Sequence, residues 1–167
     1  MRIRNISHQS IRILFLILFA ACNAPTIESS STDTPQTSGQ NWVIFPQKQA
    51  EEMGIVAGLV SSDNYWTPSN SDIFKIEDQI VEFLSQNPNF FFYQPPVWER
   101  LDQYQSQYIG LKREGKQIIY GNYFCDNLGR DWKREFIFVL DGGECYFQIE
   151  YDVHSGEFIN LMVNGES

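Results

Sequence analysis

Basic side chains are scarce in this 167-residue chain. Twelve Lys and Arg stand against 21 Asp and Glu, and the formal charge is −9. Such a surplus of negative charge repels phosphate backbones and bare anionic lipid, so the sequence argues against a nucleic-acid partner. With two histidines and three cysteines in the whole chain, a zinc site built from several His or Cys ligands is not expected. We therefore predict no metal and no other cofactor.

Residues typical of active sites are also few. The one histidine after residue 21 is His154, in a predicted turn, where a histidine is far more often solvated than part of a Ser-His-Asp triad. Asp141-Gly142-Gly143 is a hairpin signal without a following helix, so it does not indicate a phosphate-binding loop. The sequence has no strong enzyme signature, and we assign no catalytic residue.

Carboxylates beside predicted turns are the remaining candidates for chemistry. In pairs they could do acid–base work or bind calcium; they are Asp126, Asp131, Asp141 and Glu144. The spacing of Asp126 and Asp131 does not match a calcium loop, and acidic loops are usually only solvated. A functional carboxylate pair is the weaker interpretation.

The first 21 residues have the three parts of a secretory signal. Arg2, Arg4 and Arg12 supply positive charge, residues 11–19 supply an apolar stretch, and small residues follow. The apolar stretch is too short for an ordinary membrane span, which needs about 20 residues. Removal of residues 1–21 would leave 9 basic against 21 acidic residues, a charge of −12.

The end of this signal, Leu18-Phe19-Ala20-Ala21-Cys22, resembles a bacterial lipobox, in which the signal is cut before a cysteine that then carries an acyl lipid such as palmitate. The two alanines match the pattern, whereas Phe19 stands where an aliphatic residue is usual. The resemblance implies that Cys22 anchors the protein to a membrane of the cell envelope. Asn23 favours the outer membrane if the host has two. The alternative is a plain secretory signal with a chance cysteine.

Residues 22–40 are predicted to form a flexible tether. They are rich in Ser, Thr and Pro and contain one large apolar residue, Ile27. Such a segment cannot bury enough apolar surface to fold, and its root-mean-square reach is about 23 Å. A lipid at its start would hold the following domain, residues 41–167, near a membrane surface.

Cys125 and Cys145 remain once Cys22 is assigned to the lipid. An even pair in an oxidising compartment favours a disulfide bond over two free thiols. A simple meander places the two cysteines at opposite ends of the sheet, about 20 Å apart for a six-residue strand, whereas bonded Cα atoms lie about 5.5 Å apart. The bond therefore needs either a loop 126–134 that crosses the sheet or a different strand order.

The clearest pattern in residues 41–167 predicts one amphipathic helix. Thr67-Pro68 indicates an N-cap followed by proline in the first turn, and Pro88 ends the run near Asn87. Apolar residues recur at helical spacing at Ile73, Ile76, Ile80, Phe83 and Leu84. Acidic residues are expected mostly on the rest of the helix surface, at Asp72, Glu77, Asp78 and Glu82.

Around this helix the sequence period changes to two, which predicts strands. A short apolar run at 55–60 precedes the helix. After a short helical turn near Trp98 and Leu101, strands are expected at 108–111, 117–125, 135–140, 145–153 and 158–163. We predict an α+β domain in which one amphipathic helix packs on an antiparallel sheet of four to six strands.

This order of elements resembles the cystatin-like and NTF2-like folds. The resemblance rests on layout alone, and Gln107-Tyr108-Ile109-Gly110 does not match the hairpin motif of the inhibitor family, so protease inhibition is not implied. The segments Asp141-Gly142-Gly143-x-Cys145-Tyr146-Phe147 and Val163-Asn164-Gly165-Glu166 also resemble small bacterial proteins of unassigned function. That resemblance implies no active site.

Aromatic residues make up 15% of the chain, more than a small core needs. We expect most of them to be buried, with Trp98 and the run 90–93 capping the open end of the core. Trp66 and Trp132 lie beside polar loop residues and are expected to be exposed, where they could stack on sugar rings or contact a protein. They are the predicted partner-binding residues.

Together these patterns predict a non-catalytic binding module of the cell envelope, held at a membrane through Cys22, with an envelope protein or a glycan as partner. The alternative is a small extracytoplasmic ligand-binding domain or hydrolase that uses a cavity between helix and sheet. A pocket lined by Tyr120, Phe147 and Tyr151 with a buried carboxylate would favour this alternative, and a filled core would favour the binding module.

Overall fold

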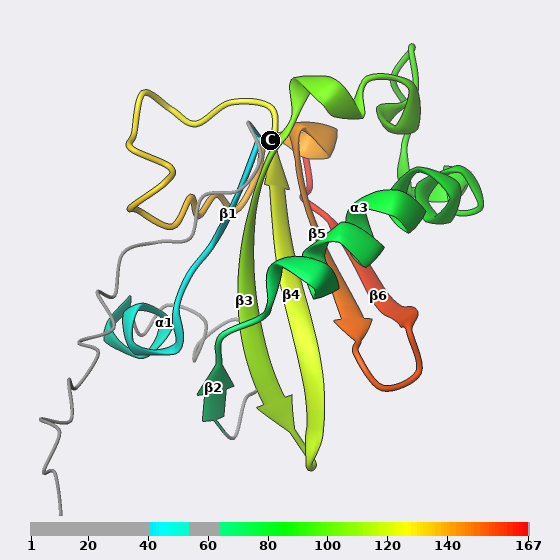
Figure 1. The fold of residues 1–167 in the computed structure, drawn as a ribbon. Coiled ribbons are helices and arrows are strands. Elements are labelled where there is room, and N and C mark those ends of the chain that lie inside the picture. The colour runs from blue at the N-terminus through cyan, green and yellow to red at the C-terminus, as the bar shows by residue number, and fades with distance from the viewer. Residues whose placement is uncertain (1–40, 54–63, 167) are drawn as a thin grey trace, which may run out of the picture. The chain divides into compact units, whose positions relative to one another are not determined.

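The structure, a computed structural model, describes residues 41–53 and 64–166 (Figure 1). The predicted signal, the tether with Cys22 and the strand expected at 55–60 lie outside these two ranges. Within them, no helix combines the length and the apolar character that crossing a membrane requires.

The described residues form a six-stranded mixed sheet and two α-helices, which confirms the α+β class. The strands are β1 (Trp42–Ile44), β2 (Asn64–Trp66), β3 (Gln105–Arg113), β4 (Lys116–Phe124), β5 (Tyr146–Asp152) and β6 (Glu157–Val163). They lie in the order β1-β3-β4-β5-β6, and β2 also pairs with β3.

Two details of the predicted fold are wrong. β1 runs parallel to β3, so the sheet is not purely antiparallel. The chain leaves β1 and returns to β3 only after α3 (Asn70–Ser85), and a long connection of this kind permits parallel pairing. A second helix, α1 (Gln47–Met53), follows β1 directly, so the predicted single helix is not confirmed.

α3 begins two residues later than the sequence pattern indicates. Its N-cap is Ser69, which forms a capping box: the Asp72 N–H donates to Ser69 Oγ at 3.3 Å, and the Ser69 N–H donates to Asp72 Oδ2 at 3.1 Å. Thr67 is therefore not the cap, and its hydroxyl oxygen accepts the Gln47 N–H at 2.8 Å.

One face of the sheet packs against α3, which crosses in front of the strands in Figure 1. The helix buries its predicted apolar stripe, Ile73, Ile76, Ile80 and Leu84, against sheet residues such as Tyr108, Phe147 and Tyr151. Three short 3₁₀-helices, η1 (Pro88–Phe90), η2 (Val97–Glu99) and η3 (Leu101–Gln103), lead from α3 to β3. The last two confirm the helical turn expected there.

The other face of the sheet is covered by α1 and by the segment 126–142. Phe136 and Ile137 of this segment are buried against sheet residues that include Ile109 and Tyr120. The strand predicted at 135–140 is not formed, although this segment has the alternating pattern of one. β3 and β5 already occupy both sides of β4, so the segment finds no strand to pair with there.

Side-chain amides take the place of a strand pairing for this segment. Gln107, Asn122 and Gln148 stand directly opposite one another on β3, β4 and β5, and Asn164 follows β6. The amides are linked by hydrogen bonds of 3.2 Å (Asn122 to Gln107), 3.4 Å (Gln148 to Asn122) and 3.3 Å (Gln148 to Asn164). We call these four residues the amide row.

The amide row bonds to the backbone of the covering segment. The Ile137 N–H donates to Gln107 Oε1 at 2.9 Å, and the Ile137 carbonyl accepts Asn122 Nδ2 at 2.8 Å. Asn164 Nδ2 donates to the Val139 carbonyl at 2.6 Å. Buried backbone groups must be paired, and here the sheet supplies the partners from its side chains.

The missing strand also explains how the two cysteines meet. Because 135–140 is not in the sheet, β4 pairs directly with β5, and Phe124 at the end of β4 stands opposite Tyr146 at the start of β5. Cys125 and Cys145 are the next residues outward. They form the predicted disulfide bond, with Cα atoms 5.0 Å apart.

Candidate functional site

Three aromatic side chains are exposed on the loop after α3. They are Phe90, Phe92 and Tyr93, which we call the aromatic cluster, and Phe92 is 81% exposed. Phe91 is buried, and its ring centroid lies 5.9 Å from that of Phe147. Phe91 therefore caps the core as predicted, whereas the prediction is wrong for its neighbours, which face solvent.

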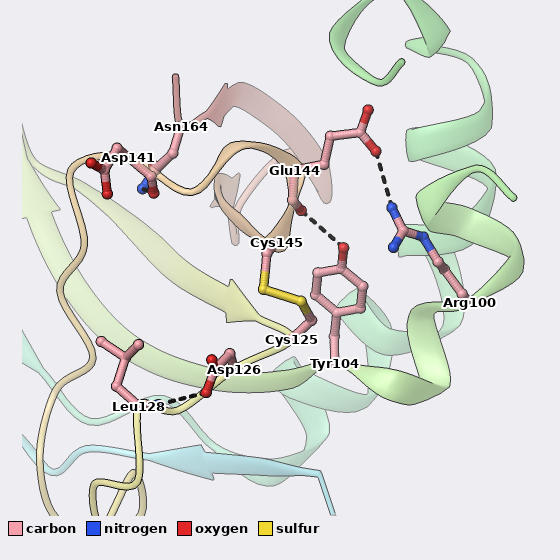
Figure 2. The surroundings of a disulfide bond; sticks show 9 residues. All are labelled: Arg100, Tyr104, Cys125, Asp126, Leu128, Asp141, Glu144, Cys145 and Asn164. Atoms are coloured by element: carbon pink, nitrogen blue, oxygen red, sulfur yellow. Dashed lines mark hydrogen bonds and ion pairs between the residues drawn. A yellow bond between two sulfur atoms is a disulfide. The ribbon is translucent and has the colours of Figure 1, made fainter. Parts of the chain in front are cut away.

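The buried carboxylate of Glu144 holds this loop in place. Its Oε1 accepts the backbone N–H groups of Phe92 and Tyr93, the latter at 2.7 Å. Its Oε2 accepts Arg100 Nη2 at 3.1 Å (Figure 2). A buried carboxylate that is paired with arginine and bonded to two N–H groups is a fixed anchor. Both oxygens are occupied, so Glu144 is poorly placed to act as an acid or base.

The 3₁₀-helix η4 (Gly143–Cys145) connects this anchor to the sheet. Cys145 is tied to Cys125 at the end of β4, and the Tyr104 hydroxyl donates to the Glu144 carbonyl at 2.9 Å (Figure 2). In the same view Arg100 lies at the right, and its guanidinium group points toward the Glu144 carboxylate. Glu144 is thus fixed through its side chain, its carbonyl and the neighbouring disulfide.

The aromatic cluster borders an open groove of about 560 Å³. Its other wall is the end of β6 and the residues after it, where the Gly165 carbonyl accepts the Gly143 N–H at 3.0 Å. Polar groups come from Asn89, Asn164 and Glu166, and none of the lining residues is basic. The volume lies within the usual range of ligand pockets, about 300 to 1,000 Å³.

The groove offers contacts for binding and few for covalent chemistry. The Tyr93 hydroxyl donates to the Glu166 carboxylate, and this hydrogen bond raises the pKa of the Tyr93 phenol, with burial and the charges of Glu166 and Glu144 adding to it. The phenol therefore stays neutral at physiological pH. No Ser, Thr, Cys or His lines the groove, so a hydroxyl or thiol nucleophile activated by histidine is absent from its lining; its carboxylates are Glu144 and Glu166.

The two tryptophans predicted to bind a partner lie elsewhere. Trp132 is only 8% exposed and belongs to the core under segment 126–142, so the expected exposure is wrong. Trp66 is half-buried over Gly110, and its Nε1 donates to the Leu111 carbonyl at 3.1 Å. Trp66 packs on the α3 side of the sheet, so the structure does not bring the two together.

The other candidates for chemistry are dispersed. Asp126 and Asp131 are exposed, and each has a local partner: the Leu128 N–H donates to Asp126 at 2.8 Å, and Arg134 lies 3.8 Å from Asp131. His154 is exposed in its turn. Residues 41–53 and 64–166 contain no group of three or more His, Cys, Asp or Glu placed to hold a metal ion.

The cavity anticipated from Tyr120, Phe147 and Tyr151 is not formed by those residues. Phe147 and Tyr151 face α3, whereas Tyr120 belongs to the opposite face of the sheet. A smaller cavity does lie between α3 and the sheet, and a carboxylate, Glu77, lines it. Glu77 was expected on the outer helix surface, although it lies four residues after Ile73 and three before Ile80, which places it on the apolar stripe.

Comparison with known proteins adds no assignment: no family model matches the chain, and no curated protein or solved structure is significantly similar to it.

Proposed function

We propose that the protein is a lipid-tethered, non-catalytic binding module of the cell envelope, and that its groove binds a glycan. The observation that carries this proposal is the exposure of Phe90, Phe92 and Tyr93 on a loop whose backbone is fixed by Glu144. Large apolar side chains held rigidly in solvent are unfavourable for folding alone, and they commonly mark a binding surface. A pre-ordered loop also lowers the entropy cost of binding.

The composition of the groove supports a glycan. Sugar rings have apolar faces that stack on aromatic rings and hydroxyl edges that bond to amides and carboxylates. The groove supplies both kinds of group, the first from the aromatic cluster and the second from Asn89 and Glu166. A protein partner would need about 800 Å² of complementary surface, more than three aromatic side chains provide.

The negative charge of the domain and of the groove disfavours anionic glycans. The chain is acidic, and no basic residue lines the groove. Anionic polysaccharides would meet like charge on Glu166 and on the domain as a whole. Neutral sugars and amino sugars, N-acetylated or free, fit this surface better.

Titration with the tetramer of N-acetylglucosamine tests the proposal. We expect saturable binding that shifts the NMR signals of residues 89–93 and 163–166. The double substitution Phe92→Ala and Tyr93→Ala should weaken it about tenfold or more, since each aromatic contact is worth roughly 1 kcal/mol. Phe74→Ala removes a ring of α3 that is 58% exposed and lies outside the groove, and it should leave sugar binding unchanged. Absence of binding at millimolar sugar, or equal binding by the double variant, contradicts the glycan assignment.

The tether is tested separately by the intact mass of protein from the membrane fraction. A chain that begins at Cys22 and carries a lipid-sized increment supports anchoring, and Cys22→Ser should move the protein to the soluble fraction. A bare chain cut after Ala21 would contradict the lipid anchor and leave the groove proposal standing.

A further inference from the structure

Among the shielded carboxylates of residues 41–53 and 64–166, Glu77 differs from the others in having no Lys or Arg partner within these ranges. Five carboxylates in the described ranges are not exposed: Asp72, Glu77, Glu144, Glu150 and Asp152. All but Glu77 have a Lys or Arg nitrogen nearby, at 3.9, 3.1, 2.8 and 3.7 Å respectively. No Lys or Arg within residues 41–53 and 64–166 forms an ion pair with Glu77. A shielded carboxylate normally requires such a partner.

Hydroxyl groups hold one side of the Glu77 carboxylate. Glu77 Oε1 accepts the Tyr108 hydroxyl, and Ser106 Oγ lies 3.5 Å from the same oxygen. The Tyr108 and Tyr123 hydroxyls are 2.5 Å apart, so the network continues into the sheet. Burial raises the pKa of Glu77, and the two hydroxyl hydrogen bonds oppose this rise. Within the described ranges no group donates to Oε2.

The carboxylate opens on a cavity of about 240 Å³ between α3 and the sheet. Ser106 and Tyr123 line its polar side with Glu77, and Leu101 and Val81 line its apolar side. Val81 is 46% exposed, so the cavity communicates with solvent beside it. The cavity is distinct from the groove, with which it shares no lining residue.

We propose that this cavity binds a small organic ammonium ion whose charged group pairs with Glu77. The ligand would supply the positive charge that the described residues do not. A second carboxylate, Asp102, also lines the cavity, and no basic residue does. An alkyl chain on the ion would contact Leu101 and Val81 on the apolar side of the cavity.

A bare metal ion fits this site less well than an organic cation. Metal ions of the hard type take six or more oxygen ligands, several of them carboxylates. The described residues provide no cluster of three such ligands, and much of the cavity wall is hydrocarbon. The mixture of two carboxylates, hydroxyls and an apolar wall matches an ammonium head with a short carbon chain.

Butylammonium is the first probe, with 1-butanol as its neutral counterpart. We expect butylammonium to shift the amide signals of residues 77, 106 and 123 saturably, and butanol to bind about tenfold more weakly or not at all, because it lacks the charge. Nα-acetyl-lysine methylamide offers the same ammonium on a lysine side chain. Tighter binding of this probe assigns the cation to a partner's lysine, and tighter binding of butylammonium assigns it to a free amine. Equal binding of butanol and butylammonium overturns the proposal.

Glu77→Gln tests the contribution of the carboxylate charge to binding, because it removes the charge and keeps a side chain of nearly the same size. The amide oxygen can still accept the Tyr108 hydroxyl, while the charge is lost, so butylammonium binding should weaken about tenfold or more. Glu82→Gln makes the same change at an exposed position of the same helix and should have no effect. Equal weakening in both variants would indicate diffuse attraction and overturn the proposal, as would unchanged binding by Glu77→Gln. Val81→Trp, at the exposed side of the cavity, should block binding even if Glu77→Gln does not fold.

Discussion

The two faces of the sheet are covered by different means. α3 satisfies its own backbone hydrogen bonds, so it needs only an apolar stripe to pack on one face. Segment 126–142 covers much of the other face without regular structure, and the amide row of the sheet bonds to its backbone. Because this segment lacks secondary structure, its buried backbone N–H and C=O groups must find hydrogen-bond partners on the sheet beneath it. The stability of the face under α3 should therefore depend on the volume of its buried apolar side chains. The stability of the other face should depend on side-chain hydrogen bonds and on the disulfide bond.

Loss of volume on the α3 face should have the largest effect. Ile80 is fully buried between helix and sheet. Ile80→Ala should lower the free energy of unfolding by about 3 to 4 kcal/mol, because it removes apolar contacts and leaves a cavity. Urea unfolding followed by circular dichroism measures the change. A loss below about 1 kcal/mol would mean that α3 is not an essential cover.

Removal of the disulfide, which closes the cover of the other face, should lower the free energy of unfolding slightly less than Ile80→Ala does. Cys125 and Cys145 are 20 residues apart, and the segment between them is the irregular cover. Replacement of both by Ala should cost about 3 kcal/mol, since the bond restricts the unfolded chain. Hydrogen exchange distinguishes the two faces: after this replacement the Ile137 N–H should lose more protection than the amides of α3. Equal losses would argue that the two covers unfold together.

The amide row should contribute less than the disulfide. Gln107→Ala leaves the buried Ile137 N–H and the Trp132 and Glu135 carbonyls without their partner. We expect a loss of about 2 kcal/mol in the free energy of unfolding. Gln117→Ala, at an exposed position of β4, is the matched control and should change stability by less than about 0.5 kcal/mol. If the two variants behave alike, side-chain amides do not hold the cover.

The smallest effect is the pH dependence from Glu77. Burial raises the pKa of Glu77 above its ordinary value of 4.5, so the folded state holds this proton more tightly than the unfolded state. The stability that this group contributes is complete below the ordinary pKa and is lost as pH rises through the raised one. Glu77→Gln should lack this loss, so its free energy of unfolding relative to the wild type should increase over that interval. Unfolding titrations between pH 4 and 8 compare the two; a constant difference would contradict the raised pKa.

The difference between the faces also explains what could be predicted from the sequence. The α3 stripe is local, and the spacing of its isoleucines was sufficient to locate the helix. Residues 135–140 have the alternation of a strand, yet strand formation depends on neighbours, and none is free there. Asn122 and Gln148 lie inside predicted strands, whereas Gln107 precedes the strand predicted at 108–111, which in the structure begins at Gln105. Only the register shows that the three amides stand side by side.

The groove could not be predicted, because no local sequence pattern marks it. Its walls come from residues 89–93, 143–144 and 163–166, which are distant along the chain. Polar neighbours in the sequence favour exposure of Trp66 and Trp132 as binding residues, but tertiary packing buries Trp132. The position of Glu77 in the smaller cavity, by contrast, could have been predicted from the sequence, because a helical projection puts it among the buried isoleucines.

Glu144 recognises the main chain of Phe92 and Tyr93 rather than their rings. The shape of the loop is therefore insensitive to which side chains it displays. Under the proposal that the groove binds a glycan, exchange of the residues at 90, 92 and 93 would alter the ligand preference while the anchor and the disulfide stayed as they are. The proposed ligand contacts are side-chain atoms, whereas Glu144 bonds to backbone atoms of the loop. On this proposal, the three side chains could be exchanged to bind another ligand without a change in the rest of the domain.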